Sequence, residues 1–110
     1  RGLVNYTQGD IITMDFNPQQ GHEQSGRRPA LVISNDILNY HSSMAMVCPI
    51  TNTNKHHPFH IELDDRTQTT GVILCDQAKM LDIGARNGKF KEKCPEDIWK
   101  EARDLVTSFM

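Results

Sequence analysis

Short apolar segments separated by glycine, proline, asparagine and charged residues fill most of the chain, and a single helical pattern ends it. Six of these segments predict strands, by alternation or by continuous apolarity: residues 10–16, 30–34, 44–51, 59–63, 71–75 and 78–81. From Pro95 to Met110, apolar residues recur at helical spacing, and two acids after the proline suit the positive end of a helix dipole. Asn35 or Asp36 can cap a short helix that ends near Tyr40. Strands followed by a terminal helix predict an α+β fold that is mainly β, or a partly open barrel.

Length and charge limit the function classes. With 110 residues, the chain is expected to form one domain spanning residues 1–110. Its 12 Lys and Arg against 14 Asp and Glu give a formal net charge of −2, whereas a general nucleic-acid coat carries a basic excess. Any nucleic-acid role must therefore rest on a local basic site.

Cysteine spacing and hydropathy indicate the compartment. Cys48, Cys75 and Cys94 are far apart and form no Cys-x-x-Cys pair, so we expect reduced thiols. No apolar run approaches the roughly 20 residues of a membrane span, and the first residues show no signal-peptide pattern. A cytoplasmic protein without membrane contact is expected.

The most charge-dense segment is residues 21–29, which links the first two predicted strands. It holds His22, Glu23, Arg27 and Arg28 between glycines and a proline. Loops of this kind on a rigid scaffold often carry catalytic or binding residues. The proline also restricts the residue before it to extended backbone, so Arg28 enters its strand in a defined direction. The alternative is a solvated hairpin loop whose charges face water.

Two other groups of residues suggest different chemistry. His56, His57 and His60 lie close together, but no carboxylate or cysteine completes a recognisable zinc spacing, so we expect solvated histidines and no metal. Cys48 with a histidine suggests thiol catalysis, but its apolar strand predicts a buried, inactive thiol. No glycine-rich phosphate loop of the Walker or dinucleotide type is present, and no cofactor is expected.

Polar residues also stand where strands end or break, and such positions gather at one rim of a small barrel: His22, Glu23, Arg27, Arg28, Thr51, Asp76 and Gln77. These residue types are the ones that metal-free RNA cleavage needs. A base takes the proton from a ribose 2′-hydroxyl, a cation stabilises charge on the phosphorane, and an acid protonates the departing 5′-oxygen. Arginine suits the charge-stabilising role because its planar fork matches phosphate oxygens.

Several motifs follow one another in a familiar order: Gly9-Asp10-Ile11, Phe16-Asn17-Pro18, residues 21–29, Cys48-Pro49-Ile50-Thr51, residues 70–77 and residues 81–86. With these motifs and a terminal helix that starts at Pro95-Glu96, nearly the whole chain resembles the MazF/PemK (Kid) family of toxin–antitoxin endoribonucleases. The resemblance implies an SH3-like, partly open barrel of the MazF/CcdB type with a C-terminal helix, assembled as a homodimer. It also implies sequence-specific, metal-independent cleavage of single-stranded RNA (mRNA) that leaves 2′,3′-cyclic phosphate and 5′-hydroxyl ends.

The resemblance further implies site residues. In MazF-like members the catalytic pair is the arginine of the loop-end Arg-Pro and the threonine of Pro-x-Thr, here Arg28 and Thr51. In the Kid-like branch the histidine of Gly-His-Glu and the aspartate of Cys-Asp-Gln are implicated, here His22 and Asp76. That branch has an arginine where this chain has Leu74, so the catalytic charge is expected from Arg28. Other polar residues are expected to bind RNA: Glu23, Gln24, Arg27, Asn52, Gln77, Lys79 and Arg86.

Two other functions stay open at this point. A CcdB-like toxin of the same fold would poison gyrase without cutting nucleic acid, but such chains place a tryptophan near the C-terminus, whereas Trp99 lies within the helical pattern. A non-catalytic nucleic-acid-binding barrel would need exposed aromatic side chains for stacking, for which Tyr6, Tyr40 and Phe90 are available.

A toxin of this kind needs an inhibitor. A cognate antitoxin with an acidic disordered tail is expected to cover the rim that holds Arg27, Arg28 and the basic residues 86–93. The RNA motif that is recognised is expected to depend on the shape of the loops.

Overall fold

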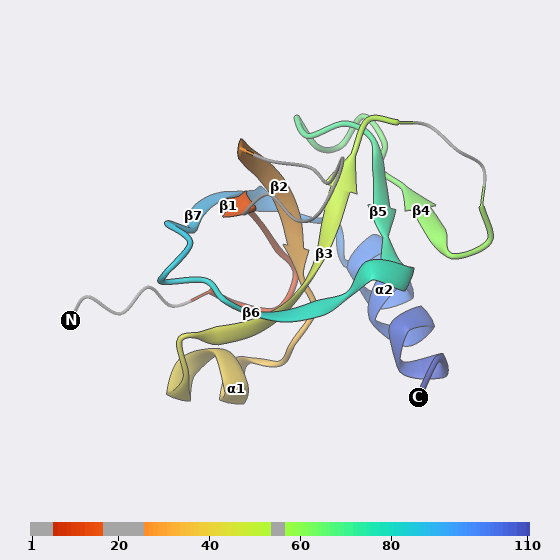
Figure 1. Cartoon of the computed structure of the whole chain (residues 1–110). Helices are drawn as coiled ribbons and strands as arrows, with labels where there is room; N and C mark the ends of the chain where they lie inside the picture. Colours follow the sequence, from red (N-terminus) through yellow and green to blue (C-terminus); the bar gives the residue numbers. More distant parts are fainter. Residues whose placement is uncertain (1–5, 17–25, 54–56) are drawn as a thin grey trace, which may run out of the picture.

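The computed structural model describes residues 6–16, 26–53 and 57–110. In this part the chain forms a curved antiparallel sheet with one long helix packed against it and a short helix after its second strand (Figure 1). The elements follow in this order: β1 (Asp10–Phe16), β2 (Gly26–Val32), α1 (Asp36–His41), β3 (Met44–Thr51), β4 (His60–Glu62), β5 (Val72–Leu74), the 3₁₀ turn η1 (Cys75–Gln77), β6 (Lys79–Asp82), β7 (Lys89–Lys93) and α2 (Glu96–Ser108). Neither described helix has the length and apolar character that crossing a membrane requires.

Strand β3 holds the sheet together because it pairs along its whole length. Its first half pairs with β6, its middle pairs with β2, and its last two residues pair with β5. The sheet order is β4-β5-β3-β2-β1-β7, and β6 lies off this path beside β3. Among the described strands, the edge strands β4 and β7 do not pair with each other, so the sheet does not close into a barrel. This arrangement confirms the expected α+β, mainly β fold with a C-terminal helix.

Alternation along the strands produces two apolar clusters on opposite faces of the sheet. Cluster 1 packs against α2 and consists of buried residues Ile11, Leu31, Ile33, Cys48, Ile50, Ile61, Ile73, Cys75, Cys94, Ile98, Ala102 and Val106. Cluster 2 lies on the other face and consists of Tyr6, Ile12, Met14, Ala30, Val32, Ala45, Val47 and Ile83. Strand β1 contributes to both clusters, since neighbouring Ile11 and Ile12 are each fully buried. It is therefore a central strand with two buried faces.

Helix α2 covers cluster 1 with the apolar stripe that the sequence predicts. The residues that pack there are Ile98, Trp99, Ala102, Leu105 and Val106. Phe109, which the sequence pattern also assigns to the stripe, caps the end of the helix and is 44% exposed. The Trp99 ring lies against the backbone of Gly9, where an added Cβ atom would stand 2.6 Å from the ring Nε1. Gly9 also has a φ of +96°, a conformation that side-chain-bearing residues rarely adopt. The helix begins one residue later than predicted, because Pro95 is its N-cap.

Strand β7 is not predicted from the sequence. Its residues are mostly charged, and its pairing with β1 contains an irregularity between Ile11 and Ile12. Its acid, Glu92, accepts hydrogen bonds from the Gln68 amide (3.0 Å), the Thr69 amide (2.8 Å) and Thr69 Oγ1 (2.6 Å). Burial acts to raise the pKa of Glu92, but these hydrogen bonds outweigh it and lower the pKa. The segment is a strand because its backbone pairs with β1, a long-range contact that no local sequence pattern reveals.

Candidate active site

Arg28 and Thr51 lie at the same end of the β2–β3 pair. Ala30 in β2 is the antiparallel partner of Pro49 in β3, and Arg28 and Thr51 are each two residues further toward the same end. Arg28 is also the partner of Met14 in β1, which belongs to cluster 2. Both side chains therefore extend the cluster 2 face of the sheet at its rim.

Arg28 has hydrogen-bonding capacity that the described protein does not use. Its side chain is half-buried, and among the described residues its buried Nε has no hydrogen-bond partner. An unmet buried donor costs about 1–3 kcal/mol, so a ligand that accepts from it is favoured. Thr51 is half-buried, and its Oγ1 accepts a hydrogen bond from the Thr53 amide at 3.2 Å. The hydroxyl proton of Thr51 can therefore be donated to a bound oxygen.

Arg27 has a different environment from its neighbour. Its guanidinium contacts Asp15 Oδ1 at 3.0 Å, the carbonyl and hydroxyl of Thr13 at 3.0 Å each, and the Asn87 carbonyl at 2.7 Å. A hydrogen bond from Asn87, followed by the nearby Arg27, lowers the pKa of Asp15 although partial desolvation opposes this. The contacts of Arg27 tie β2 to β1 and to the turn before β7. They occupy donors that were expected to bind RNA.

A second group of polar residues lies at the other end of β5. Thr51 pairs with Val72 at the start of β5, and His60 pairs with Leu74 at its end. Val72 and Leu74 are two residues apart, about 7 Å along the strand, and β3 and β4 lie on opposite sides of β5, so this group is separated from the rim. Asp76 follows in η1, and its Oδ1 lies 3.3 Å from Nε2 of His60.

The histidine prediction is only partly right. His57 is exposed, but His60 is half-buried and paired with Asp76, so the expectation of a solvated side chain is wrong for His60. The two imidazole rings stack with centroids 4.7 Å apart. His56 lies outside the described residues. Pairing the predicted strands 59–63 and 71–75 as a hairpin would have indicated that His60 approaches Asp76.

The other predicted residues are distributed over both groups. Asn52 is exposed and accepts a hydrogen bond from Thr70 Oγ1 at 2.7 Å, and Arg86 approaches the Asp15 carbonyl at 3.4 Å near the rim. Gln77 and Lys79 are exposed beside Asp76, away from Thr51. Three predicted residues of the first loop lie outside the described residues: His22, Glu23 and Gln24.

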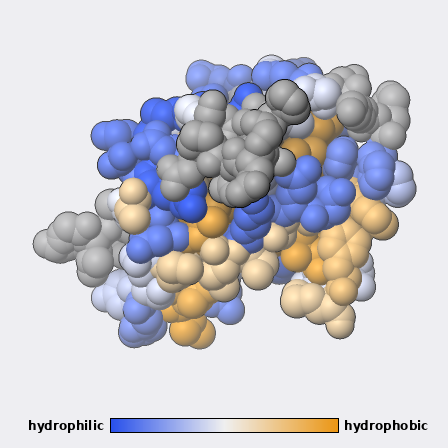
Figure 2. Space-filling model, viewed as in Figure 1, coloured by the Kyte–Doolittle hydropathy of each residue, from blue (hydrophilic) through white to orange (hydrophobic). Residues whose placement is uncertain are grey.

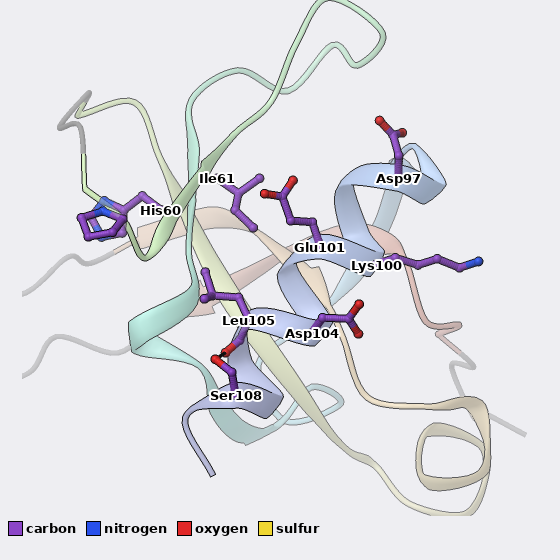
Figure 3. A pocket seen from close by; sticks show the side chains of 9 residues that line it. His60, Ile61, Asp97, Lys100, Glu101, Asp104, Leu105 and Ser108 are labelled. Atoms are coloured by element: carbon purple, nitrogen blue, oxygen red, sulfur yellow. Dashed lines mark hydrogen bonds between the residues drawn. The ribbon is translucent and has the colours of Figure 1, made fainter.

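A pocket of about 620 Å³ lies between β4 and α2, on the face opposite to Thr51 (Figure 3). Ile61 points toward the helix in this view, whereas the His60 ring points away from it. The charged lining from α2 is mainly acidic, with Asp97, Glu101 and Asp104 against Lys100. Asp97 is paired with Arg66 and Asp104 with Arg103, so the pocket offers a phosphate no excess of positive charge and is a poor site for an RNA backbone.

The family model described as PemK-like, MazF-like toxin of type II toxin–antitoxin system matches residues 7–110. The chain belongs to the PemK/MazF toxin family. It is 37% identical over 106 residues to the endoribonuclease PemK of Escherichia coli, covering 93% of this chain and 80% of that protein. It is also 37% identical over 91 residues to the endoribonuclease toxin MazF of Escherichia coli K12, covering 82% of this chain and 81% of the relative.

A solved structure supports the same conclusion for the fold of this PemK/MazF family member. The MazE–MazF crystal structure from Deinococcus radiodurans superposes with a TM-score of 0.86 at 34% identity, covering 96% of both chains. The resemblance stated from the motifs is thereby confirmed.

Proposed function

We propose that this PemK/MazF family member is a sequence-specific, metal-independent endoribonuclease that cleaves single-stranded mRNA. The observation that carries the proposal is the half-buried Arg28, whose buried Nε has no partner among the described residues, at the same strand end as Thr51. A guanidinium with free donors at a rim is suited to a phosphate group. The relatives named PemK and MazF are endoribonucleases, which supports the same activity here.

The chemistry follows from these groups. The ribose 2′-oxygen attacks the adjacent phosphorus while a base takes its proton, and a 2′,3′-cyclic phosphate forms. The bond from phosphorus to the 5′-oxygen breaks, and an acid protonates that oxygen to give a 5′-hydroxyl. Arg28 stabilises the charge on the phosphorane, and the Thr51 hydroxyl donates to a phosphate oxygen. His22 is the proposed group that takes the first proton and returns it to the 5′-oxygen, whereas Asp76, at the other end of β5 from Thr51, is proposed to assist by contacting the RNA beside the cut.

Assembly and control belong to the same proposal. Large apolar side chains are exposed on α1 and β6, with Ile37 74%, Tyr40 63% and Met80 43% exposed. Figure 2 shows hydrophobic surface over these elements, and such a patch supports a homodimer interface. The Deinococcus relative was crystallised as a MazE–MazF complex. We propose that an antitoxin with an acidic disordered tail covers the basic rim in the cytoplasm, with inhibition that weakens as salt rises.

A 2′-deoxy substitution tests the mechanism. An RNA that carries one 2′-deoxynucleotide at the cut site should not be cleaved, because the nucleophile is missing. The same RNA with the 2′-deoxynucleotide several positions away should be cleaved normally, and chelator should not reduce cleavage of either the control or the all-ribose RNA. Cleavage at the 2′-deoxy site, or loss of activity in chelator, would contradict the proposed mechanism.

A further inference from the structure

His57, His60 and Asp76 bring three potential metal ligands together. One ligand atom from each lies within 4.8 Å of the other two. His57 precedes β4, His60 is its first residue, and Asp76 belongs to η1, which follows the strand paired with β4. The cluster therefore depends on the β4–β5 pairing and joins residues that are far apart in the sequence.

The distance between His60 and Asp76 matches two ligands of one ion better than it matches a strong hydrogen bond. His60 Nε2 and Asp76 Oδ1 are 3.3 Å apart. A charge-assisted hydrogen bond between such groups is about 2.7–2.9 Å long. Two ligands at about 2.0–2.1 Å from a tetrahedral zinc ion are roughly 3.3 Å apart.

One of the three side chains is held in place and the other two can turn, which suits a binding site. The strand pairing holds His60 in place. Its ring nitrogen Nδ1 is buried, and its other ring nitrogen, Nε2, faces Asp76. His57 and Asp76 are exposed and can turn toward an ion. The His57 ring accepts a hydrogen bond from the Phe59 amide at 3.2 Å, a weak contact that turning would break.

We propose that His57, His60 and Asp76 form a divalent-cation site of the zinc type, with the fourth position open to water. Two imidazoles and one carboxylate suit zinc, whereas magnesium and calcium prefer all-oxygen sites. With both imidazoles neutral, the ligand set carries one negative charge. His60 also lines the adjoining pocket, to which Glu101 adds a carboxylate that favours cation entry.

Zinc at this site would occupy the carboxylate of Asp76. If Asp76 takes part in RNA cleavage, a consequence that rests on the proposed function, the ion acts as an inhibitor. Zinc binding at this site would then regulate an enzyme whose catalytic chemistry needs no metal.

Calorimetric titration with zinc chloride tests the site directly on the tag-free full chain, after chelator treatment and removal of the chelator. The native chain should bind one zinc ion, and His57→Gln and His60→Gln should each weaken binding roughly tenfold or more. His41→Gln is the matched control, because His41 is exposed at the end of α1 and lies outside the cluster. It should bind zinc as the native chain does, and magnesium chloride should give no binding to any of the proteins.

No zinc binding at micromolar concentration, or equal weakening in the His41→Gln control, would overturn the site. Should His60→Gln fail to fold, the exposed His57→Gln decides the question. The consequence for activity is measured separately by RNA cleavage with zinc, and then with zinc plus chelator. Cleavage should fall and recover in the native chain but stay constant in His57→Gln. Binding without inhibition would refute the role given to Asp76, whereas a chain that binds zinc and never cuts RNA would refute the proposed function alone.

Discussion

Two adjacent arginines in β2 have different environments because a strand turns successive side chains to opposite faces. Arg27 is bound to Asp15 and Asn87, while the Nε of Arg28 has no partner among the described residues. The first therefore contributes to the β1–β2 contact, and the second has donors left for a ligand.

Replacing Arg28 should consequently affect turnover more than stability. Arg28→Ala is expected to lower kcat by about 10²–10³-fold, the usual cost of losing one preorganised charge stabiliser. Arg28→Lys should restore little, because an ammonium lacks the bidentate fork. Arg27→Ala should lower Tm more than Arg28→Ala does, although its exposed ion pair is worth less than about 1 kcal/mol. Near-native turnover in Arg28→Ala, measured on a folded sample, would remove Arg28 from the mechanism.

The end of β3 depends on one glycine in the connection between β4 and β5. Gly71 has a φ of +116°, and a Cβ atom there would stand 2.2 Å from the Thr51 carbonyl oxygen. A side chain at this position would displace the strand end that carries the Thr51 hydroxyl.

Gly71→Ala should therefore reduce both stability and RNA cleavage. Gly26→Ala is the matched control: its φ is +84°, but none of the described atoms lies within 4 Å of the added Cβ. The free energy of unfolding of the control, measured with denaturant, should fall only by the cost of backbone strain, about 1–2 kcal/mol. Equal losses of stability in the two variants would show that the contact with Thr51 does not matter.

Local patterns predicted the elements that bury their own side chains. β3 was predicted with its observed bounds because residues 44–51 are almost continuously apolar, and α2 was predicted from a stripe that does pack on cluster 1. β7 was not predicted, because it becomes a strand through pairing with β1. The same distinction between local patterns and long-range pairing applies to the residues of the candidate site. The shared rim of Arg28 and Thr51 follows from strand ends, whereas the approach of His60 to Asp76 depends on the β4–β5 register, which composition does not reveal.

At the scale of the whole molecule, a buried thiol couples stability to alkaline pH. Cys94 is 4% exposed between β7 and α2. Burial, assisted by the nearby Asp97 carboxylate, raises the pKa of Cys94 to about 12. An unfolded cysteine ionises near pH 8.5. The protonated thiol therefore contributes stability that is complete below about pH 8.5 and is lost as pH rises toward 12.

Cys94→Ala should accordingly show a shallower fall of Tm between about pH 8 and pH 10.5 than the native chain. The variant loses packing at every pH, so the slope of Tm against pH, and not its absolute value, is the quantity to compare. Identical slopes would show that this thiol does not titrate on unfolding.

The packing of Trp99 on Gly9 gives the molecule an internal optical reporter. The sequence contains one tryptophan, and its ring lies between the backbone of Gly9 and the cations of Lys100 and Arg103, 5.9 and 5.4 Å from the ring centroid. Its fluorescence therefore comes from a single known place, the contact between α2 and the turn before β1. Departure of α2 from the sheet would expose the indole to water and shift its emission to longer wavelength. A shift that precedes the loss of β-sheet circular dichroism would mean that the helix leaves before the sheet melts.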